Sequence, residues 1–558
     1  MASVSRDVFV AGVDDDKLMA YFEQCEVNAD DLISDSDSDL DSESSEGIIP
    51  DTPPGSPQLK RKRLFVSSCT NTNTNCVNVL TDSSSDDDDH NDNDYDYDRD
   101  FEEILSTEND HILQPPISFM ELPGLKHAPP PDSPPISYFN LYFTFPLLSL
   151  IVAETNRYAD QTLDLQELSP SSRSKSWRRT TIDEMRAFIA VILNMGLIRK
   201  PTIVSYWNTT DHISTPWFGK MFSRNRFQLL LKFFHLVDNS KLSPPGSPDY
   251  DPCARFLPLL DHANRLFRHH YTPHQQLSID ESLVGTKCHT QLLQYLPNKH
   301  HHKWGIKFWM ICDAVSKYCL GFYTYRGAKS KEDKNEIKNN GLAYTVVMKL
   351  LSLGNYLMKG YHIYMDNFFT SIPLARHLYS VGTFITGTIR RNRKGLPDAL
   401  KKQFKSVSNK YFRQGPILLV GSKQKKSQKN QVVLISTHGT ATESDVIATA
   451  RNRNEPKKKP DVILDYNRYM GGIDANDMML YFYLDERRTV KYWKKVALNI
   501  ISRMVLNSYL LYLENSNGKN MTRLQFYSSI IESLSTDWFG KRKEINNLVN
   551  INDVNIPV

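Results

Sequence analysis

Cysteine is scarce in this chain of 558 residues. Only seven cysteines are present, their spacing is irregular, and none follows Cys319. An odd and scattered set of this kind does not build the disulfide framework of a secreted domain. We expect no signal peptide, because acidic residues in the first 20 positions stand where its apolar segment would be. We therefore expect reduced thiols in an intracellular protein.

Long hydrophobic runs are also lacking. The most apolar stretch, residues 141–153, is too short to cross a bilayer and contains Pro146. The sequence therefore predicts a soluble protein with no membrane partner. Its length is sufficient for roughly two to four structural units with a sizeable core.

Each part of the chain is depleted in charge of one sign. Residues 1–120 contain 29 Asp and Glu against 7 Lys and Arg, a net charge of −22. The remaining 438 residues contain 60 Lys and Arg against 35 Asp and Glu, a net charge of +25. A basic body indicates a polyanionic partner, most often nucleic acid, and the acidic arm could compete for the same surface.

The acidic arm is predicted to be disordered. Its runs at 34–46 and 83–100 consist largely of Ser and Asp and cannot bury enough apolar surface to fold. Between them lies a compact basic cluster, which predicts nuclear import; a simple charged patch is the alternative. The cluster consists of Lys60, Arg61, Lys62 and Arg63. A proline-rich spacer at 128–135 marks the point where order is expected to begin.

The hydrophobic period changes along the remaining chain. Helical spacing predominates from 137 to about 272 and returns at 474–486 and 490–515. From 276 the pattern predicts three strands, a helix, a strand, a helix and a strand, the order of an RNase H-like core. The predicted strands are 276–280, 304–314, 318–327, 361–366 and 383–389, and the two helices are 341–359 and 371–380. Residues 390–465 are expected to be basic and irregular.

Three aspartates occupy positions that such a core would bring together. Asp280 lies on the first strand, Asp366 ends the fourth strand, and Asp474 opens a later helix. Three converging carboxylates repel one another unless a cation is bound, and oxygen ligands suit Mg²⁺ or Mn²⁺. Two such ions can activate an attacking oxygen and stabilise the leaving oxygen at a phosphodiester. The alternative is that these are ordinary strand-end and helix-start acids.

Asp477 and a group of cysteines and histidines are two further sets of potential metal ligands. Asp477 lies one turn beyond Asp474, and a helix-surface or salt-bridge role is favoured for it over metal binding. A second group of cysteines and histidines has a spacing that fits no zinc finger, so zinc is not expected. That group consists of Cys288, His289, His300, His301, His302 and Cys312.

Several motifs resemble the piggyBac transposase family in order and at comparable spacing, over roughly residues 137–530. The principal stretches are 277–285, 294–309, 361–374, 385–397 and 465–479. The resemblance implies that Asp280, Asp366 and Asp474 are the catalytic and metal-binding residues, holding two Mg²⁺ or Mn²⁺ ions. It implies cleavage of transposon ends by activated water, hairpin formation by the freed 3′-hydroxyl, and joining at TTAA targets. The implied partners are double-stranded DNA and a second copy of the chain in a homodimer.

The resemblance also implies an architecture. The fold class is α/β, with an RNase H-like catalytic core (a mixed five-stranded sheet with flanking helices) that an insertion domain interrupts. A mainly helical DNA-binding and dimerisation domain and the disordered acidic N-terminus complete it. The expected boundaries are 1–120 for the acidic region, 121–272 and 484–558 for the helical domain, 273–395 and 462–483 for the catalytic domain, and 396–461 for the insertion domain.

Predicted DNA contacts fall in three basic segments near this core. Loops of this composition are usually solvated, but phosphate contact is favoured beside a phosphoryl-transfer site. For Trp493, the alternative to DNA contact is a packing role in the core. The predicted DNA-binding residues are Arg390, Arg391, Arg393, Lys394, Lys457, Lys458, Lys459, Trp493, Lys494 and Lys495.

The chain departs from the family pattern in three places, one of which is 285–291, where the family usually carries a glycine-arginine turn after the first acid. Family members commonly end in a cysteine-rich zinc module that reads the terminal repeats, whereas here the last cysteine is Cys319. Histidines 300–302 stand where the family favours Arg or Lys, which weakens phosphate contacts. The alternative function is therefore a domesticated, catalytically idle DNA-binding protein, and an unrelated nuclease of the same fold ranks last.

Overall fold

The computed structural model describes residues 100–105, 110, 117–165, 168–296, 303–327, 334–447, 456–487, 489–516 and 521–553. The chain separates into two units, residues 1–76 and 77–558, and every described residue belongs to the second. The basic cluster at 60–63, most of the acidic arm and histidines 300–302 lie outside the described residues.

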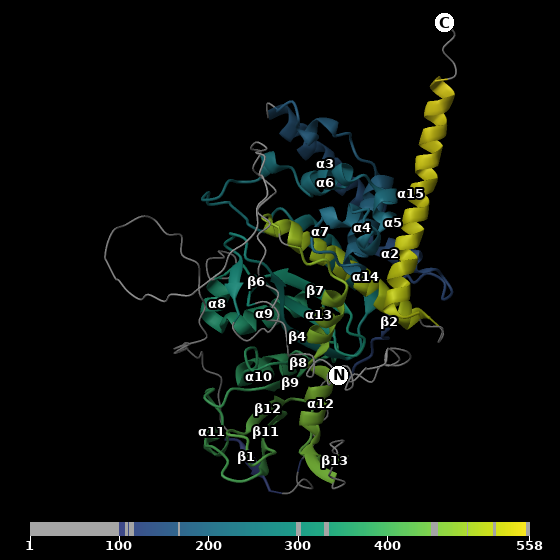
Figure 1. The fold of residues 1–558 in the computed structure, drawn as a ribbon. Helices are drawn as coiled ribbons and strands as arrows, with labels where there is room; N and C mark the ends of the chain where they lie inside the picture. The colour runs from purple at the N-terminus through teal and green to yellow at the C-terminus, as the bar shows by residue number, and fades with distance from the viewer. Residues whose placement is uncertain are drawn as a thin grey trace, which may run out of the picture. The chain divides into compact units, whose positions relative to one another are not determined.

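One large mixed sheet organises this part of the chain (Figure 1). It has ten strands in the order β1-β10-β11-β12-β9-β8-β4-β6-β5, with β7 also paired to β6. The strands are β1 (Glu102–Ile104), β2 (Gly124–Leu125), β3 (Tyr271–Thr272), β4 (Gln276–Gly285), β5 (Leu293–Tyr295), β6 (Trp304–Asp313), β7 (Cys319–Thr324), β8 (His362–Met365), β9 (Phe384–Thr388), β10 (Ser408–Gln414), β11 (Ile417–Lys423), β12 (Val432–Ser436), β13 (Glu443–Ile447) and β14 (Pro456–Pro460).

The α/β class and the order of the predicted strands are confirmed. Strands β4, β6 and β7 pair antiparallel, whereas β8 is parallel to both β4 and β9. Parallel neighbours require a crossover, and helices α9 (Leu342–Leu353) and α10 (Ile372–Ser380) provide the crossovers into β8 and β9. The boundaries predicted between domains are not tested by these observations and stay predictions.

The expectation of an irregular segment at 390–465 is wrong. Strands β10, β11 and β12 form an antiparallel series, and β12 pairs with β9 through Ile435 and Gly387, so this segment extends the same sheet. The runs ILLVGSK of β11 and VVLIS of β12 are almost entirely buried. Basic loops between these short strands dominate the composition, and they concealed the apolar runs.

The helices gather mainly at the two ends of the described sequence. They are α2 (Pro135–Tyr142), α3 (Phe145–Leu165), α4 (Ile182–Leu197), α5 (Pro216–Met221), α6 (Arg224–Phe233), α7 (Leu257–His270), α8 (Lys334–Asn340), α9 (Leu342–Leu353), α10 (Ile372–Ser380), α11 (Asp398–Lys401), α12 (Asp461–Tyr469), α13 (Gly472–Phe482), α14 (Tyr492–Asn515) and α15 (Arg523–Asp553). Short 3-10 helices are η3 (Arg173–Ser176), η4 (Val204–Trp207), η5 (Asp211–Ile213) and η6 (Asn239–Lys241). Thr181 caps α4, because its side chain accepts a hydrogen bond from the Glu184 amide.

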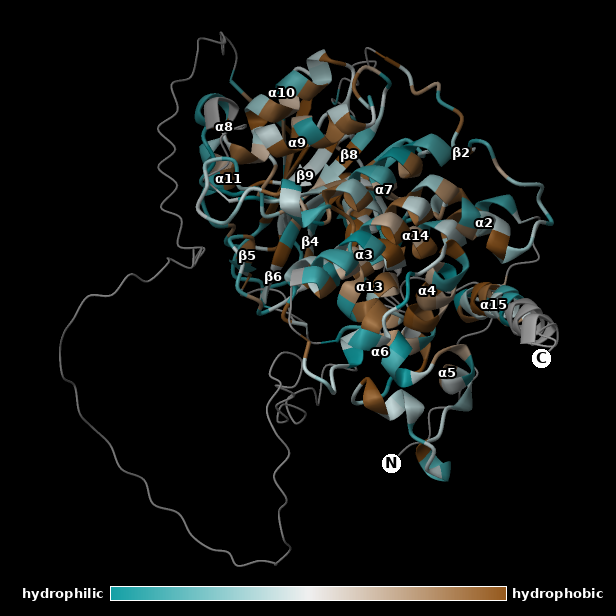
Figure 2. Ribbon diagram, turned by 90° about the horizontal axis from the view of Figure 1, so that it is seen from above, coloured by the Kyte–Doolittle hydropathy of each residue, from teal (hydrophilic) through white to brown (hydrophobic). Residues whose placement is uncertain are grey.

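Helices from the two ends of the chain pack together. Helix α14 contacts α2 and α7, and α15 contacts α4 and α2. By length and composition α14 could cross a membrane, but 83% of its apolar window is buried inside the fold, as in the core helix of a soluble protein. In Figure 2 the hydrophobic residues gather around α4, α13 and α14.

Candidate active site

The pairing of β4 with β8 places Asp280 and Asp366 at neighbouring positions. The two strands are parallel, and Ile279 is opposite Met365. The next residue on each strand is the predicted aspartate. Two residues at equivalent positions on adjacent parallel strands lie about 5 Å apart along the backbone. The register therefore brings together two acids that are 86 positions apart in the sequence.

A tight turn holds Asp366 in place. Its Oδ1 accepts a hydrogen bond of 3.0 Å from the Phe368 amide, and its carbonyl accepts one of 2.7 Å from Thr370 Oγ1. A Cβ at Gly387 of β9 would lie only 2.3 Å from Thr370 Oγ1, so glycine makes room for the turn. The turn thus supplies hydrogen-bond partners to Asp366 where the fully buried strand β8 ends.

Helix α13 lies along the face of β4 that carries Asp280. Ser278, Asp280 and Ser282 share that face, because side chains two positions apart on a strand point to the same side of the sheet. A Cβ at Gly472 would lie 2.2 Å from Ser278 Oγ, and Ser282 Oγ donates a hydrogen bond of 2.9 Å to Asp477. Asp474 lies between these two contacts in the sequence, on the helix that packs against β4.

The hydroxyl of Tyr466 on α12 experiences the negative charge of all three aspartates. The pKa of this hydroxyl is raised to about 12, chiefly by burial; the hydrogen bond with Thr388 opposes this rise, and the negative charges of Asp366, Asp280 and Asp474 contribute to it. The hydroxyl also lies 3.4 Å from Thr388 Oγ1 at the end of β9. Sequence reasoning missed Tyr466; its only signal was its place in the motif that precedes Asp474.

Asp366 lies in surroundings that disfavour its charged form. Burial raises the pKa of its carboxyl, and the charge of Glu281 raises it further. Backbone amides of Phe368 and Phe369 and the charge of Arg390 act in the opposite direction without cancelling the effect. A carboxylate in this setting gains free energy from any added cation.

Asp477 has a different role from Asp474. Its Oδ1 accepts a hydrogen bond of 2.8 Å from Nη2 of Arg503, whose side chain is 2% exposed. Arg503 also donates to Asn476, which in turn donates to the carbonyl of Lys317 at 2.8 Å. The salt-bridge prediction for Asp477 is confirmed, and the network fastens α13 to the sheet and to α14.

Asp280, Asp366 and Asp474 are the residues that would hold the divalent metal implied by the family resemblance. Within the described part of the chain, no group of three or more His, Cys, Asp or Glu side chains lies close enough to hold a metal ion. Asp280, Asp366 and Asp474 thus share a neighbourhood without forming a closed ligand set. Their donor chemistry nevertheless fits a hard divalent cation, since all ligands are carboxylate oxygens and the local field is negative.

The first basic segment lies beside this site. Arg390 Nε donates to Asn367 at 3.3 Å, and Arg393 donates to the Phe368 carbonyl at 3.4 Å, so both contact the Asp366 turn. The neighbouring Arg391 is half-buried and Lys394 is exposed. Their predicted DNA contact stays a prediction, and their position next to Asp366 supports it.

The segment at the start of α14 is largely buried. Trp493 is 2% exposed and packs its ring against Phe234 and His235. Lys494 Nζ donates to the carbonyls of Leu231 and Lys232 at the end of α6, at 2.6 and 2.8 Å. The packing role of Trp493 is therefore present, and a DNA contact by either side chain would require local rearrangement.

Other predicted residues lie elsewhere. Burial lowers the pKa of the half-buried Lys495. Lys457, Lys458 and Lys459 lie on β14, whose partner is β13, and α12 follows directly. In the cysteine and histidine group, Cys288 donates to the Thr489 carbonyl, and Cys312 is fully buried opposite Cys319.

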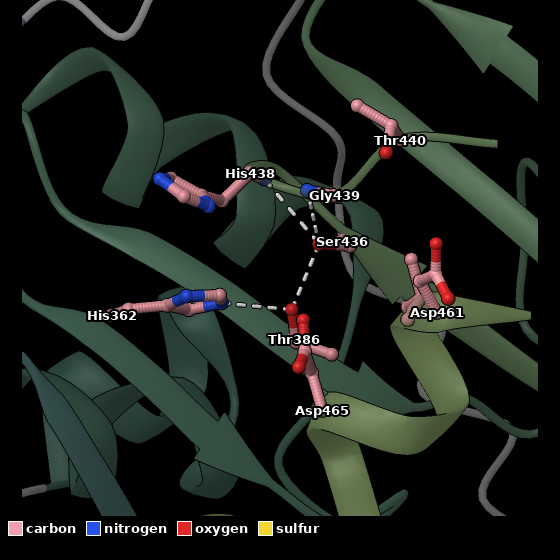
Figure 3. Close-up of a pocket in the computed structure, with 9 residues that line it drawn as sticks. His362, Thr386, Ser436, His438, Gly439, Thr440, Asp461 and Asp465 are labelled. Carbon is pink, nitrogen blue, oxygen red and sulfur yellow. Dashed lines mark hydrogen bonds between the residues drawn. The ribbon is translucent and has the colours of Figure 1, made fainter. Parts of the chain in front are cut away.

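A small polar cavity of about 120 Å³ lies on another side of α12 (Figure 3). His362 Nε2 is 2.8 Å from Thr386 Oγ1, which is 2.8 Å from Ser436 Oγ. Burial lowers the pKa of His362 well below its usual value, and the nearby His438 lowers it further. The cavity is lined by His362, Thr386, Ser436, His438, Gly439, Thr440, Asp461, Val462 and Asp465. Its volume is enough for about four water molecules.

Comparisons with known proteins agree with this geometry. The family described as Transposase IS4 matches residues 134–509. Human PiggyBac transposable element-derived protein 3 is 25% identical over 73% of this chain and 67% of its own length. Human PiggyBac transposable element-derived protein 2 is 24% identical over 68% of this chain and 61% of its own length.

A solved structure extends the match to three dimensions. The piggyBac transposase synaptic complex with hairpin DNA aligns with a TM-score of 0.64 and 25% identity. The alignment covers 78% of this chain and 88% of that chain. The family match covers all three aspartates, Asp280, Asp366 and Asp474. This chain therefore belongs to the piggyBac family of transposases and transposase-derived proteins.

Proposed function

We propose that this protein is a DNA transposase of piggyBac type. In this proposal it cleaves DNA strands, forms hairpins and joins ends at TTAA sites. The observation that carries the proposal is the shared field of Asp280, Asp366 and Asp474 at the Tyr466 hydroxyl. Carboxylates from three separate elements are costly to collect unless the site uses them.

The three aspartates would hold the divalent ions, Mg²⁺ or Mn²⁺, with two expected. Bound there, such ions supply an activated water or 3′-hydroxyl and charge stabilisation at the leaving oxygen. The chain's own residues position the reaction: the β4–β8 register fixes Asp280 beside Asp366, and the contacts of α13 fix Asp474. Arg390 and Arg393 lie where a phosphate approaching Asp366 would need a positive charge.

The remaining features of the proposal concern partners, domains and location. The partner is double-stranded DNA, at transposon ends and TTAA targets, and the protein acts as a homodimer in the nucleus. Strands β4, β6, β7, β8 and β9 would form the RNase H-like core, and β10–β14 the insertion domain. The related solved structure is a synaptic complex with hairpin DNA, which supports DNA binding and assembly of more than one copy.

One observation favours a second candidate function, that of a DNA-binding protein without catalytic activity. Because the described residues form no closed metal-binding group, a catalytically idle DNA-binding protein derived from a transposase remains the alternative. Two human relatives carry names that state derivation from a transposable element.

Excision in cells tests the proposal. A reporter interrupted by the gene's own flanking DNA would be combined with the wild-type protein and with Asp280→Ala, Asp366→Ala and Asp474→Ala. We expect seamless excision by the wild type and none by the variants. If the wild type shows no excision, Mn²⁺-dependent nicking of pre-cleaved ends by purified protein distinguishes loss of end recognition from loss of catalytic activity. Absence of nicking there would establish the idle DNA-binding function instead.

A further inference from the structure

The end of the acidic region 1–120 is attached to the large sheet. Strand β1 (Glu102–Ile104) pairs antiparallel with β10 and forms one edge of that sheet. Figure 1 shows β1 in the same part of the molecule as β11, β12 and α12. A strand of three residues forms few ladder hydrogen bonds, so side-chain contacts must hold this segment in place.

Asp110 is the polar anchor of this segment. Its side chain is 3% exposed, and its two oxygens accept hydrogen bonds from Nε and Nη2 of Arg413 on β10, the second at 2.8 Å. Its Oδ2 also accepts a hydrogen bond of 2.8 Å from the amide of Ala441, and Arg413 Nη2 donates to the Gly439 carbonyl at 3.1 Å. Paired hydrogen bonds to a guanidinium fix the orientation of both groups. Asp110 therefore joins β10 to the loop that follows β12.

A small hydrophobic cluster extends from β1 to α12. Ile104 of β1 and Tyr466 of α12 both pack against it. Ala441, whose amide donates to Asp110, is one of its fully buried members. The buried members are Tyr411, Leu418, Val420, Leu434, Ala441, Val462 and Ile463. The end of the acidic region and helix α12 therefore share one apolar cluster.

The loop that contacts Asp110 is also bonded to the first turn of α12. The amide of Asp461 donates to the Thr442 carbonyl at 3.0 Å, and Thr442 Oγ1 donates to the Asp461 carboxylate. Val462 and Ile463 bury this turn in the cluster. Helix α12 has only nine residues, and helices this short are not stable without packing. Its position therefore depends on the loop and the cluster.

Tyr466 connects α12 to the three-aspartate site. Gly387 of β9 is opposite Met365 of β8 in the parallel register, so Thr388 follows in the row that contains Asp366. The hydroxyl of Tyr466 lies 3.4 Å from Thr388 Oγ1. A displacement of α12 would therefore move the Tyr466 hydroxyl relative to the aspartates.

We propose that Asp110 is a positioning residue of the three-aspartate site, and that β1 and Asp110 together act as a strap that holds α12 in place. The expected effect on DNA cleavage rests on the proposed function, whereas the effect on α12 does not. Helix α13, which carries Asp474, begins only three positions after α12 ends at Tyr469. Loss of the strap should therefore loosen both Tyr466 and Asp474, and the end of the acidic region belongs to the catalytic unit.

Hydrogen–deuterium exchange of the full chain tests the effect on α12. Asp110→Asn removes the charge that pairs with Arg413 and nearly keeps the shape of the side chain. We expect amide exchange in α12 to rise about tenfold or more, with exchange in β4 and β8 at the wild-type level. Mn²⁺-dependent nicking of pre-cleaved ends should fall about 10-fold to 100-fold at saturating DNA, with the Kd for DNA changed less than about twofold.

Glu103→Gln is the matched control, because it removes one negative charge from the same strap. Glu103 and Lys410 lie 3.0 Å apart with both side chains 39% exposed, so loss of this pair should change neither exchange nor nicking. Asp110→Asn/Arg413→Gln replaces the ion pair by two neutral amides and should recover part of the protection of α12. If Asp110→Asn does not fold, Ile104→Ala weakens the strap from its apolar side and is measured in the same way.

Three outcomes would overturn the proposal. The first is wild-type exchange of α12 in both Asp110→Asn and Ile104→Ala. The second is an equal rise in β4, β8 and α12, because the strap would then support the whole fold. The third is a local rise in α12 with undiminished nicking, which would remove the positioning role. A wild type that nicks no DNA refutes the transposase activity, and the exchange of α12 then decides the strap by itself.

Discussion

Asp474 and Asp477 lie one turn apart on α13, yet their surroundings are opposite in charge. Asp477 accepts a hydrogen bond of 2.8 Å from the buried guanidinium of Arg503. Asp474 belongs instead to a group of three aspartates whose combined field raises the pKa of Tyr466. The same residue type therefore stabilises the helix at one turn and concentrates negative charge at the other.

The core repeats this distinction elsewhere. Asp313 is fully buried but accepts hydrogen bonds from the amide and Nδ1 of His274, at 2.9 and 2.8 Å. Buried carboxylates that support the fold are paired, because an unpaired buried charge is costly. Around Tyr466, by contrast, the charges of three aspartates act in the same direction, which is the pattern of a functional site rather than of a stabilising one.

The largest expected effect separates the two aspartates of α13. Asp474→Asn should lower Mn²⁺-dependent nicking by about 10³-fold or more, because it removes one member of a site that acts as a unit. Its unfolding free energy should fall by no more than about 1 kcal/mol, the usual worth of an acid in the first turn of a helix. Nicking kinetics and urea unfolding check this, and a large stability loss would contradict the functional assignment.

Breaking the supporting pair should produce the opposite pattern. Arg503→Met leaves Asp477 without its cation and should cost about 3–5 kcal/mol in urea unfolding. The double variant Arg503→Met/Asp477→Leu removes both charges and should recover much of that loss. Equal destabilisation of the single and double variants would show that packing around Arg503, rather than its charge, holds α13.

The close approach of α13 to β4 can be altered directly. Gly472→Ala places a Cβ 2.2 Å from Ser278 Oγ, which should displace the helix and cost about 1–3 kcal/mol. Removing that oxygen in Gly472→Ala/Ser278→Ala leaves Ser278's Cβ position 3.3 Å away and should restore both stability and nicking in part. If the double variant is as unstable as Gly472→Ala, the loss of stability arises from the helix backbone rather than from the contact with Ser278 Oγ.

The smallest expected effect concerns pH. The hydrogen bond to Asp313 raises the pKa of His274 above 6.5, so its contribution is complete below pH 6.5 and is lost as pH rises through the raised pKa. The pKa of Asp313 is lowered, so its contribution is lost only as pH falls below 3.8. His274→Gln should therefore cost most near pH 5–6, about 1.5 kcal/mol, and less above pH 8. Unfolding as a function of pH measures this.

His262 provides a control of opposite sign. Burial lowers its pKa, so it opposes folding as pH falls through 6.5, where the unfolded chain takes up the proton. His262→Gln should lessen the loss of stability in acid, whereas His274→Gln should increase it at pH 5–6. The same trend in both variants would show that loss of packing, rather than titration, dominates.

Local pattern was sufficient for much of this protein. Helical and strand periods predicted the five strands of the core and their order. The identity of Asp280, Asp366 and Asp474 as candidates followed from strand ends, a helix start and ordered motifs. These features depend on a few neighbouring residues, so the sequence carries them directly.

Other features depended on contacts between distant segments. Pairing of β12 with β9 extends one sheet through residues 408–436, which composition alone presented as irregular. The burial of Trp493, the Arg503 network and the place of Tyr466 among the aspartates likewise follow from packing of separate elements. By itself the sequence determined which residues carry charge and which segments become strands or helices. Only the tertiary structure decided which charges are paired and which are gathered, because strand register and helix packing set the distances between groups far apart in the chain.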